Sequence, residues 1–179
     1  PIEPILEIPS TDGIDDLHVR HYTMSSFESG VGTIIHEMLH QLGAVDLYSV
    51  HDETPSDPWH GVGDWDIMSS GNWNEDLVGN SKPSLPMAAS LELMGVERVI
   101  EYDMQRHPAT NETHLLLPMS DGGLAIKLKI SPDEYIWLEN RNQSGFDIAL
   151  PGSGLLVSHQ DTSVGNLTQN NVNTDSDNP

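Results

Sequence analysis

Cysteine is absent from this chain of 179 residues. The protein therefore cannot form a disulfide, a zinc site built from thiolates or a catalytic centre with a thiol nucleophile. Long apolar stretches are absent as well, because no run approaches the roughly 18 residues that a membrane-spanning helix needs. We therefore expect no membrane span. Hydrophobic residues make up 36% of the chain and include four tryptophans, which predicts a folded domain with a core.

Positively charged side chains are scarce, with seven lysines and arginines against 28 aspartates and glutamates. The resulting net charge of −21 repels phosphate backbones, whose binding requires basic side chains that release counterions. Nucleic acid is therefore excluded as a partner, and anionic membrane surfaces are disfavoured for the same reason. The acidic residues indicate a solvated surface, and they also supply the oxygen ligands that Ca²⁺ prefers.

Two stretches in the first half of the chain show helical periodicity. Apolar residues recur at spacings of three and four across residues 31–42, and Gly43 provides a stop signal. A second helix fits residues 85–94, with a proline in its first turn and Gly95 at its end. The segment 44–83 between them has no clear period and is rich in turn-forming residues, which is typical of a functional loop or one ordered by a ligand.

The second half of the chain has the pattern of strands. We predict that it forms an antiparallel β-rich part. Alternating or β-branched stretches separated by turn residues lie at 124–130, 135–138 and 154–159. In the first half, we predict a loop over residues 1–16 and one strand within residues 17–24. We divide the chain into residues 1–95, which carry the candidate site, and residues 96–179, a β-rich part of the same domain that ends in a polar loop.

The first predicted helix contains the sequence HEMLH, in which His36 and His40 are four residues apart. Residues at this spacing lie one above the other on a helix, so the two imidazoles can converge on one metal ion. Zinc suits imidazole ligands, and Glu37 can reach a water molecule at the metal and act as a general base.

The residues that follow extend this motif. Gly43 and Asp46 follow at intervals of three residues after His40. A third ligand on the same helical face would be crowded, so the chain must leave the helix and return, and glycine permits the positive φ of such a turn. Asp46 would then complete three protein ligands and leave a fourth position open for water, as in catalytic zinc sites.

A methionine within a turn-like segment, Met68 in WDIMSSGNW, lies 22 residues beyond Asp46. The chain here resembles the metzincins, and more specifically the immune inhibitor A family of secreted bacterial metallopeptidases. The resemblance runs from about residue 19 to residue 161 and is carried by HEMLHQLGAVDLY, WDIMSSGNW, SKPSLPMAASLELMGV and EYIWLENRNQSGFDIALPGSGLLVSHQD. It implies an α+β fold, that of a metzincin-like zinc peptidase catalytic domain.

The resemblance also implies roles for individual residues. Zinc would bind His36, His40 and Asp46, Glu37 would be the catalytic acid/base, and Met68 would be the methionine of the Met-turn beneath the zinc. Two pairs depart from the family pattern, because Met38-Leu39 stands where Phe-Gly is common and Ala44-Val45 where Leu-Pro is common. Both changes are apolar, so we expect them to leave the ligands in place.

Two further roles are open at this stage. Glu75 is an alternative third ligand, and Tyr48 is the tyrosine nearest to the motif that could donate a hydrogen bond to an oxyanion. The long loop also contains acidic residues that could hold a structural Ca²⁺, against the alternative that they are only hydrated. These residues are Asp52, Glu53, Asp57 and Asp64.

We expect a secreted, zinc-dependent endopeptidase that acts on protein or peptide substrates. The alternative is a catalytically silent relative that binds zinc and serves as a binding or scaffold module. That alternative stands because only 35 residues precede His36, whereas metzincin catalytic domains carry several strands and a helix before the zinc helix. The first residue is a proline with no leader sequence after it. We therefore expect further segments of a larger precursor.

Overall fold

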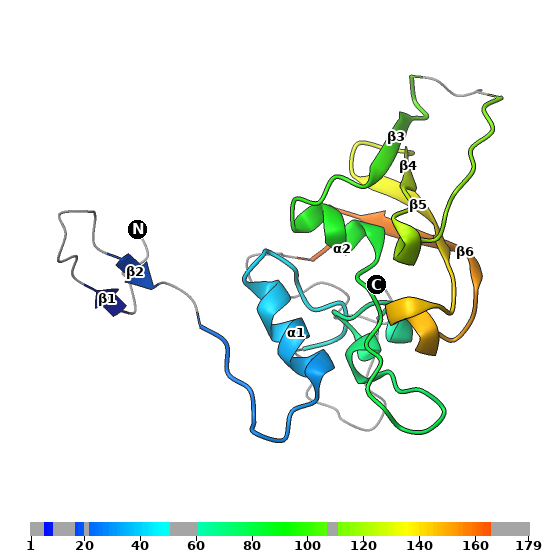
Figure 1. Cartoon of the computed structure of the whole chain (residues 1–179). Coiled ribbons are helices and arrows are strands. Elements are labelled where there is room, and N and C mark those ends of the chain that lie inside the picture. Colours follow the sequence, from blue (N-terminus) through cyan, green and yellow to red (C-terminus); the bar gives the residue numbers. More distant parts are fainter. Residues whose placement is uncertain (1–5, 9–16, 20–21, 51–60, 107–110, 166–179) are drawn as a thin grey trace.

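The structure is a computed structural model and describes residues 6–8, 17–19, 22–50, 61–106 and 111–165. Figure 1 shows a body in which α1 and α2 lie beside one sheet, with a small hairpin joined to it by an extended segment. The helices and strands, in chain order, are β1 (Leu6–Ile8), β2 (Leu17–Val19), α1 (Val31–His40), α2 (Ala88–Leu93), β3 (Val99–Asp103), β4 (Ala125–Lys129), β5 (Glu134–Arg141) and β6 (Gly154–Asp161). Short 3-10 helices span Gly63–Trp65, Ser70–Trp73, Met119–Asp121 and Gly145–Ala149.

The main sheet has the strand order β3-β4-β5-β6 and is mixed. β4 pairs antiparallel with β5, and β5 with β6, but β3 pairs parallel with β4, with Val99 opposite Ala125. The prediction of a purely antiparallel second half is therefore wrong at this edge. A long connection leads from the end of β3 to the start of β4, and a connection of that length allows the two strands to run in the same direction.

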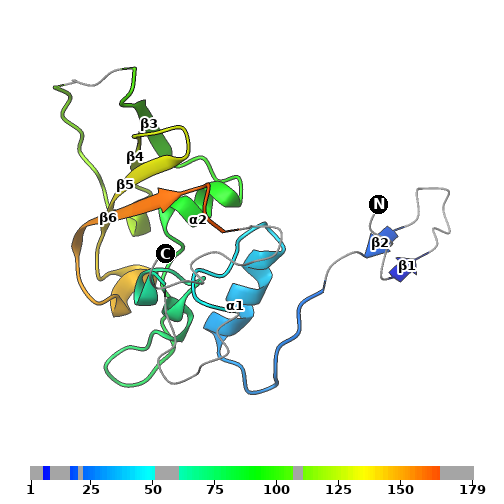
Figure 2. The same ribbon diagram turned by 180° about the vertical axis from the view of Figure 1, so that it is seen from behind.

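The hairpin β1–β2 is antiparallel, with Leu6 opposite Val19 and Ile8 opposite Leu17. The predicted loop over residues 1–16 is therefore wrong at residues 6–8, and the predicted strand within residues 17–24 is confirmed only for its first three residues. The view from behind in Figure 2 also shows this hairpin apart from the body.

Both predicted helices are confirmed, and both are shorter than their periodicity indicated. α1 ends at His40, and Gly43 closes the turn after it with a φ of +104°. α2 begins only at Ala88, because the backbone of Met87 is extended, with a ψ of 162°. N–H groups just before the helix donate to acidic side chains elsewhere in the chain. Met87 donates to Asp66, and Leu85 donates to Asp147.

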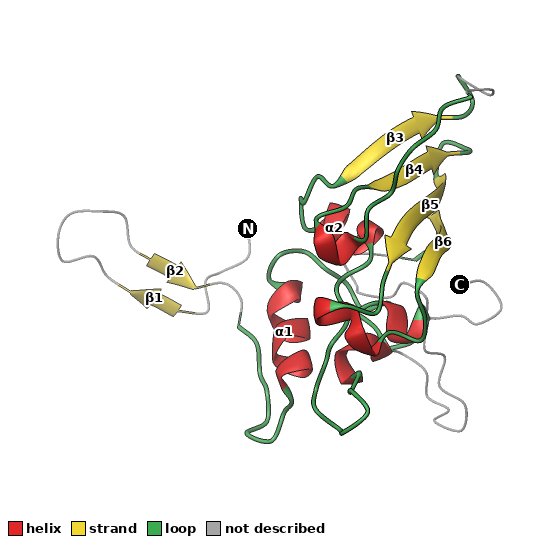
Figure 3. Ribbon diagram, turned by 45° about the vertical axis from the view of Figure 1, so that its right-hand side comes forward, coloured by secondary structure: helices red, strands yellow, loops and turns green. Residues whose placement is uncertain are grey.

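Apolar side chains form two small cores, and Figure 3 shows the helices gathered on one side of the sheet. One core joins α2 to the sheet and contains Ala88, Met119, Ala125 and the fully buried Trp137. The other lies under α1 and contains Ala44, Ile67 and Met68, with Ile35, Leu39, Leu47 and Met94 packed around them. Within the described part of the chain, no helix has the length and apolar character needed to cross a bilayer.

Candidate metal centre

α1 places His36 and His40 on one face, one turn apart, as the sequence predicts. Their ring centroids are 4.9 Å apart and the rings are nearly perpendicular, at 88°. His36 faces the interior and is 3% exposed, whereas the side chain of His40 is 24% exposed. The pair therefore combines one buried imidazole with one that reaches solvent.

The chain turns back at Gly43 and carries Asp46 to the two histidines. The Oδ1 atom of Asp46 lies 2.8 Å from Nε2 of His36 and 3.4 Å from Nε2 of His40. Zinc bonds of about 2.0–2.2 Å at tetrahedral angles separate two donor atoms by about 3.3 Å. The observed 2.8 Å and 3.4 Å lie on either side of this value, and the three donor atoms, all within 4.8 Å of one another, are close enough to share one ion.

Main-chain carbonyl groups fix the orientation of both imidazoles. The Nδ1 atom of His36 lies 2.8 Å from the carbonyl oxygen of Ile67, and Nδ1 of His40 lies 2.9 Å from that of Ala44. A carbonyl oxygen can only accept, so each Nδ1 carries the proton in its neutral ring. Each Nε2 then presents a lone pair towards Asp46, which is the tautomer that a metal ligand needs.

The Asp46 carboxylate makes the site favourable for positive charge. Burial lowers the pKa of His36, but the hydrogen bond that the protonated ring donates to Asp46, with help from the Ile67 carbonyl, raises this pKa above its ordinary value overall. The hydrogen bond to Asp46 likewise raises the pKa of His40 against the effect of burial. Protons and metal ions compete for the same ligand atoms, so a site that attracts protons in this way also attracts a divalent cation.

Glu37 and Tyr48 lie beside the three ligands. The ring of Tyr48 is 6.3 Å from that of His36, and its hydroxyl hydrogen-bonds to Asp46. Burial and the negative charge of Asp46, together with this bond and the charge of Glu37, raise the pKa of Tyr48 to about 12. The charge of Glu37 also contributes to the raised pKa of His40. The sequence alone did not place Tyr48, and the structure brings it to the site.

Met68 is fully buried in the core beneath α1, beside Ile67, whose carbonyl oxygen lies against His36. Its carbonyl oxygen accepts a hydrogen bond of 2.8 Å from the N–H of Leu47, next to Asp46. Glu75, the alternative third ligand, is exposed and pairs with Ser81 in an isolated β-bridge, so it does not join the histidines. Among the described residues, His36, His40 and Asp46 form the sole group of three potential ligand side chains close enough to share an ion.

The predicted calcium loop falls mostly outside the described residues, which omit Asp52, Glu53 and Asp57. Asp64 is described, and its carbonyl oxygen accepts a hydrogen bond of 2.9 Å from the amide of Asn74. Calcium binding at this loop therefore stays a prediction.

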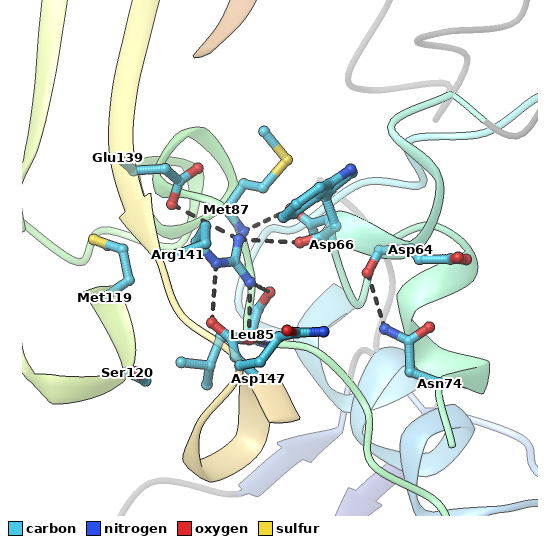
Figure 4. A network of polar contacts seen from close by, with 12 residues as sticks. Asp64, Asp66, Asn74, Leu85, Met87, Met119, Ser120, Glu139, Arg141 and Asp147 are labelled. Atoms are coloured by element: carbon cyan, nitrogen blue, oxygen red, sulfur yellow. Dashed lines mark hydrogen bonds and ion pairs between the residues drawn. The ribbon is translucent and has the colours of Figure 1, made fainter. Parts of the chain in front are cut away.

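A buried polar network adjoins the metal centre and escaped the sequence analysis (Figure 4). The guanidinium of Arg141, on β5, donates to both carboxylate oxygens of Asp147 at 2.9 Å. It also donates to the carbonyl oxygens of Trp65 at 3.0 Å and of Leu85 at 3.1 Å. Every second residue of β5 is buried from Trp137 onwards, so Glu139 and Arg141 point inward. Two charged residues at inward positions of a strand were the signal in the sequence that could have indicated this network.

Asp66 is the second element of this network and is fully buried. Its Oδ1 accepts the N–H of Met68 at 2.7 Å. Its Oδ2 accepts the N–H of Met87 at 2.8 Å and the hydroxyl of Ser90 at 2.6 Å. One carboxylate therefore ties the segment that carries Met68 to the start of α2.

Comparison with known protein families gives one match, and it covers residues 7–92, which include the metal centre and Met68. The matching family is described as immune inhibitor A peptidase M6, catalytic domain. No match was found among curated proteins or among solved structures. The matched segment includes most of β1, all of β2 and α1, and most of α2, and it ends before β3. Over residues 7–92, the chain therefore matches the catalytic domain of the immune inhibitor A peptidase family.

Proposed function

We propose that this protein is a zinc-dependent endopeptidase in which His36, His40 and Asp46 hold the metal. The observation that carries the proposal is the convergence of their three ligand atoms within 4.8 Å. Both imidazoles are fixed through Nδ1 so that Nε2 is available, as metal-ligating histidines require. The peptidase family match over the same residues supports a metallopeptidase rather than a metal-storage or purely structural site.

His36, His40 and Asp46 would hold a zinc ion, which would supply the Lewis acidity that polarises a peptide carbonyl group and activates water. Glu37 accepts the proton of the attacking water, and the same proton then passes to the amine of the departing peptide. Water adds to the carbonyl carbon and the C–N bond breaks, which yields a carboxylate and an amine.

Tyr48 is the candidate donor to the oxyanion that forms during this attack. A hydroxyl with a pKa of about 12 stays protonated at neutral pH and can donate a hydrogen bond. Its bond to Asp46 holds it beside the candidate ligands, and turning its single O–H from Asp46 to the oxyanion would stabilise the developing negative charge.

Met68 is proposed to form the apolar floor beneath the metal, as the methionine of a Met-turn. Its full burial and the hydrogen bond between its carbonyl group and Leu47 support this role. The family match supports protein substrates and action outside the cell, and the net charge of −21 suits a secreted, highly soluble enzyme. A structural Ca²⁺ in the acidic loop is part of the same proposal.

The decisive experiment measures casein hydrolysis by the zinc-loaded whole chain, before and after chelation. We expect activity that chelation abolishes and zinc restores, and a loss of at least about 100-fold in Glu37→Gln, which removes the general base. Glu97→Gln changes an exposed glutamate elsewhere and should keep full activity. Stoichiometric zinc without any hydrolysis would instead support a catalytically silent binding module.

A further inference from the structure

We propose that Asp66 and Arg141 are positioning residues for the metal centre. They hold the turn formed by residues 65–68 so that the carbonyl oxygen of Ile67 keeps the His36 imidazole in its metal-binding orientation. Neither side chain reaches the metal ligands directly. The inference rests on the proposed function, because it requires His36 to be a ligand.

The turn is held at each of its four residues. Arg141 binds the carbonyl of Trp65, and the Asp66 side chain binds the N–H of Met68 and the start of α2. The Ile67 carbonyl binds His36, and the Met68 carbonyl binds the N–H of Leu47. The backbone of the turn can therefore move only if one of these hydrogen bonds breaks.

This path connects the metal centre to the β-sheet. Arg141 belongs to β5 and is fully buried, and its guanidinium also holds the carbonyl of Leu85. Because a guanidinium is planar and its donors are rigidly arranged, it fixes the relative positions of all its acceptors. A chain of contacts therefore runs from Arg141 on β5 to the Trp65 carbonyl group, along the backbone to Ile67, and from the Ile67 carbonyl group to His36.

Stability alone is a poor explanation for this network. Asp66, Asp147 and Glu139 are three buried acids around the one cation of Arg141, and Oε2 of Glu139 has no hydrogen-bond partner among the described residues. Buried ion clusters of this kind are often no more stable than apolar side chains of similar volume. A requirement for defined backbone geometry at residues 65–68 accounts for the network better.

The test uses the whole chain and two variants of the network. Asp66→Asn keeps the shape of the side chain but replaces one acceptor oxygen with a donor. Arg141→Lys keeps the charge but cannot reach all of the acceptors at once. The dissociation constant of zinc is measured by competition with a chelator, and the visible absorption spectrum of the Co²⁺-loaded protein reports the ligand geometry.

We expect both variants to bind zinc about 10- to 100-fold more weakly than the wild type and to show an altered Co²⁺ spectrum. The matched control is Arg98→Gln, because Arg98 also donates to main-chain carbonyls, those of Met119 and Gly123, but it is not linked to the turn. This control should lose stability and keep the zinc affinity and the Co²⁺ spectrum of the wild type.

Ser90→Ala keeps the test decisive if the two buried-charge variants do not fold. It removes only the 2.6 Å hydrogen bond to Asp66, and we expect a smaller loss of zinc affinity, about threefold to tenfold, in the same direction. Wild-type affinity and an unchanged Co²⁺ spectrum in the folded variants would overturn the positioning role alone. Failure of the wild-type chain to bind zinc would overturn the proposed function as well.

Discussion

Asp46 is the residue that turns a pair of helix histidines into a candidate metal site. The i, i+4 spacing brings two imidazoles together in any helix, but a pair alone does not distinguish a metal site from packed histidines. The Asp46 oxygen at 2.8 Å and 3.4 Å from the two Nε2 atoms adds a third candidate ligand and a negative charge. The site should therefore depend on this one carboxylate.

We expect Asp46→Ala to weaken zinc binding by at least about 100-fold, because loss of a direct ligand exceeds the 10- to 100-fold effect of outer hydrogen-bond partners. Zinc affinity is measured by chelator competition. Glu75→Ala is the matched control, since Glu75 is exposed and away from the histidines, and it should bind as the wild type does. The opposite pattern would make Glu75 the third ligand.

Glu139 should make the stability of the protein depend on pH. Burial raises its pKa to about 7, against the opposing effect of Arg141. The folded protein then binds this proton more tightly than the unfolded chain, so stability is lost as the pH rises from about 4.5 to about 7. The shift corresponds to a loss on the order of 3 kcal/mol once Glu139 is ionised.

Glu139→Gln removes this titration. We expect the variant to be more stable than the wild type at pH 8 and equally stable at pH 4.5, as measured by urea unfolding at both values. The comparison with the wild type isolates Glu139 from the histidines, whose titration both proteins share. A wild type as stable at pH 8 as Glu139→Gln would contradict the assigned direction.

At the scale of elements, the end of α1 determines where Asp46 lies. Gly43 has a φ of +104°, and a Cβ atom there would lie 3.2 Å from the carbonyl oxygen of Leu93. Gly95, after α2, also has a positive φ, +77°, but a Cβ atom at that position would meet nothing within 4 Å. Both glycines therefore have a backbone conformation that disfavours other residues. They differ because only Gly43 has a close neighbour and lies three residues from Asp46.

We expect Gly43→Ala and Gly95→Ala each to cost about 1 kcal/mol of unfolding free energy, because alanine is strained at positive φ. Only Gly43→Ala should also weaken zinc binding, since it displaces the segment that carries Asp46. Urea unfolding and zinc competition on the same samples measure both effects. Equal zinc affinity in the two variants would separate the turn from the metal site.

Elements with a strong local period could be predicted from the sequence. α1 and β4 were identified because their apolar residues recur at the helix or strand period, and parts of β5 and β6 were identified from strand-forming residues between turn signals. β3 and its parallel pairing were missed, because parallel pairing depends on a partner 26 residues along the chain, as for Val99 and Ala125. A local pattern contains no information about such a partner.

For the candidate site too, residues close together in the sequence could be predicted and residues far apart could not. His36, Glu37, His40 and Asp46 lie within eleven residues, so a local motif contains all of them. The supporting network does not, because Arg141 and Trp65 are 76 residues apart. Because of this separation, the sequence could not predict the link between the sheet and the candidate metal centre. Both residues nevertheless lie within stretches that resemble the family.

At the scale of the whole molecule, hydrogen bonds connect the candidate metal centre to the sheet. The family match ends at residue 92, yet Arg141 on β5 holds the turn next to His36. The two small cores have different members, and Asp66 joins them, because it accepts the N–H of Met68 in one core and that of Met87, next to Ala88 of the other. We therefore expect the β-rich part to be needed for a properly formed metal site.

X-ray absorption spectroscopy at the zinc edge, on the whole chain loaded with one equivalent of zinc, tests the central claim most directly. The structure predicts two imidazole nitrogens and carboxylate oxygen at about 2.0–2.2 Å, with no sulfur ligand, since the chain has no cysteine. A first shell with fewer than two imidazoles, or with oxygen ligands only, would contradict the assignment of His36, His40 and Asp46 as the zinc site.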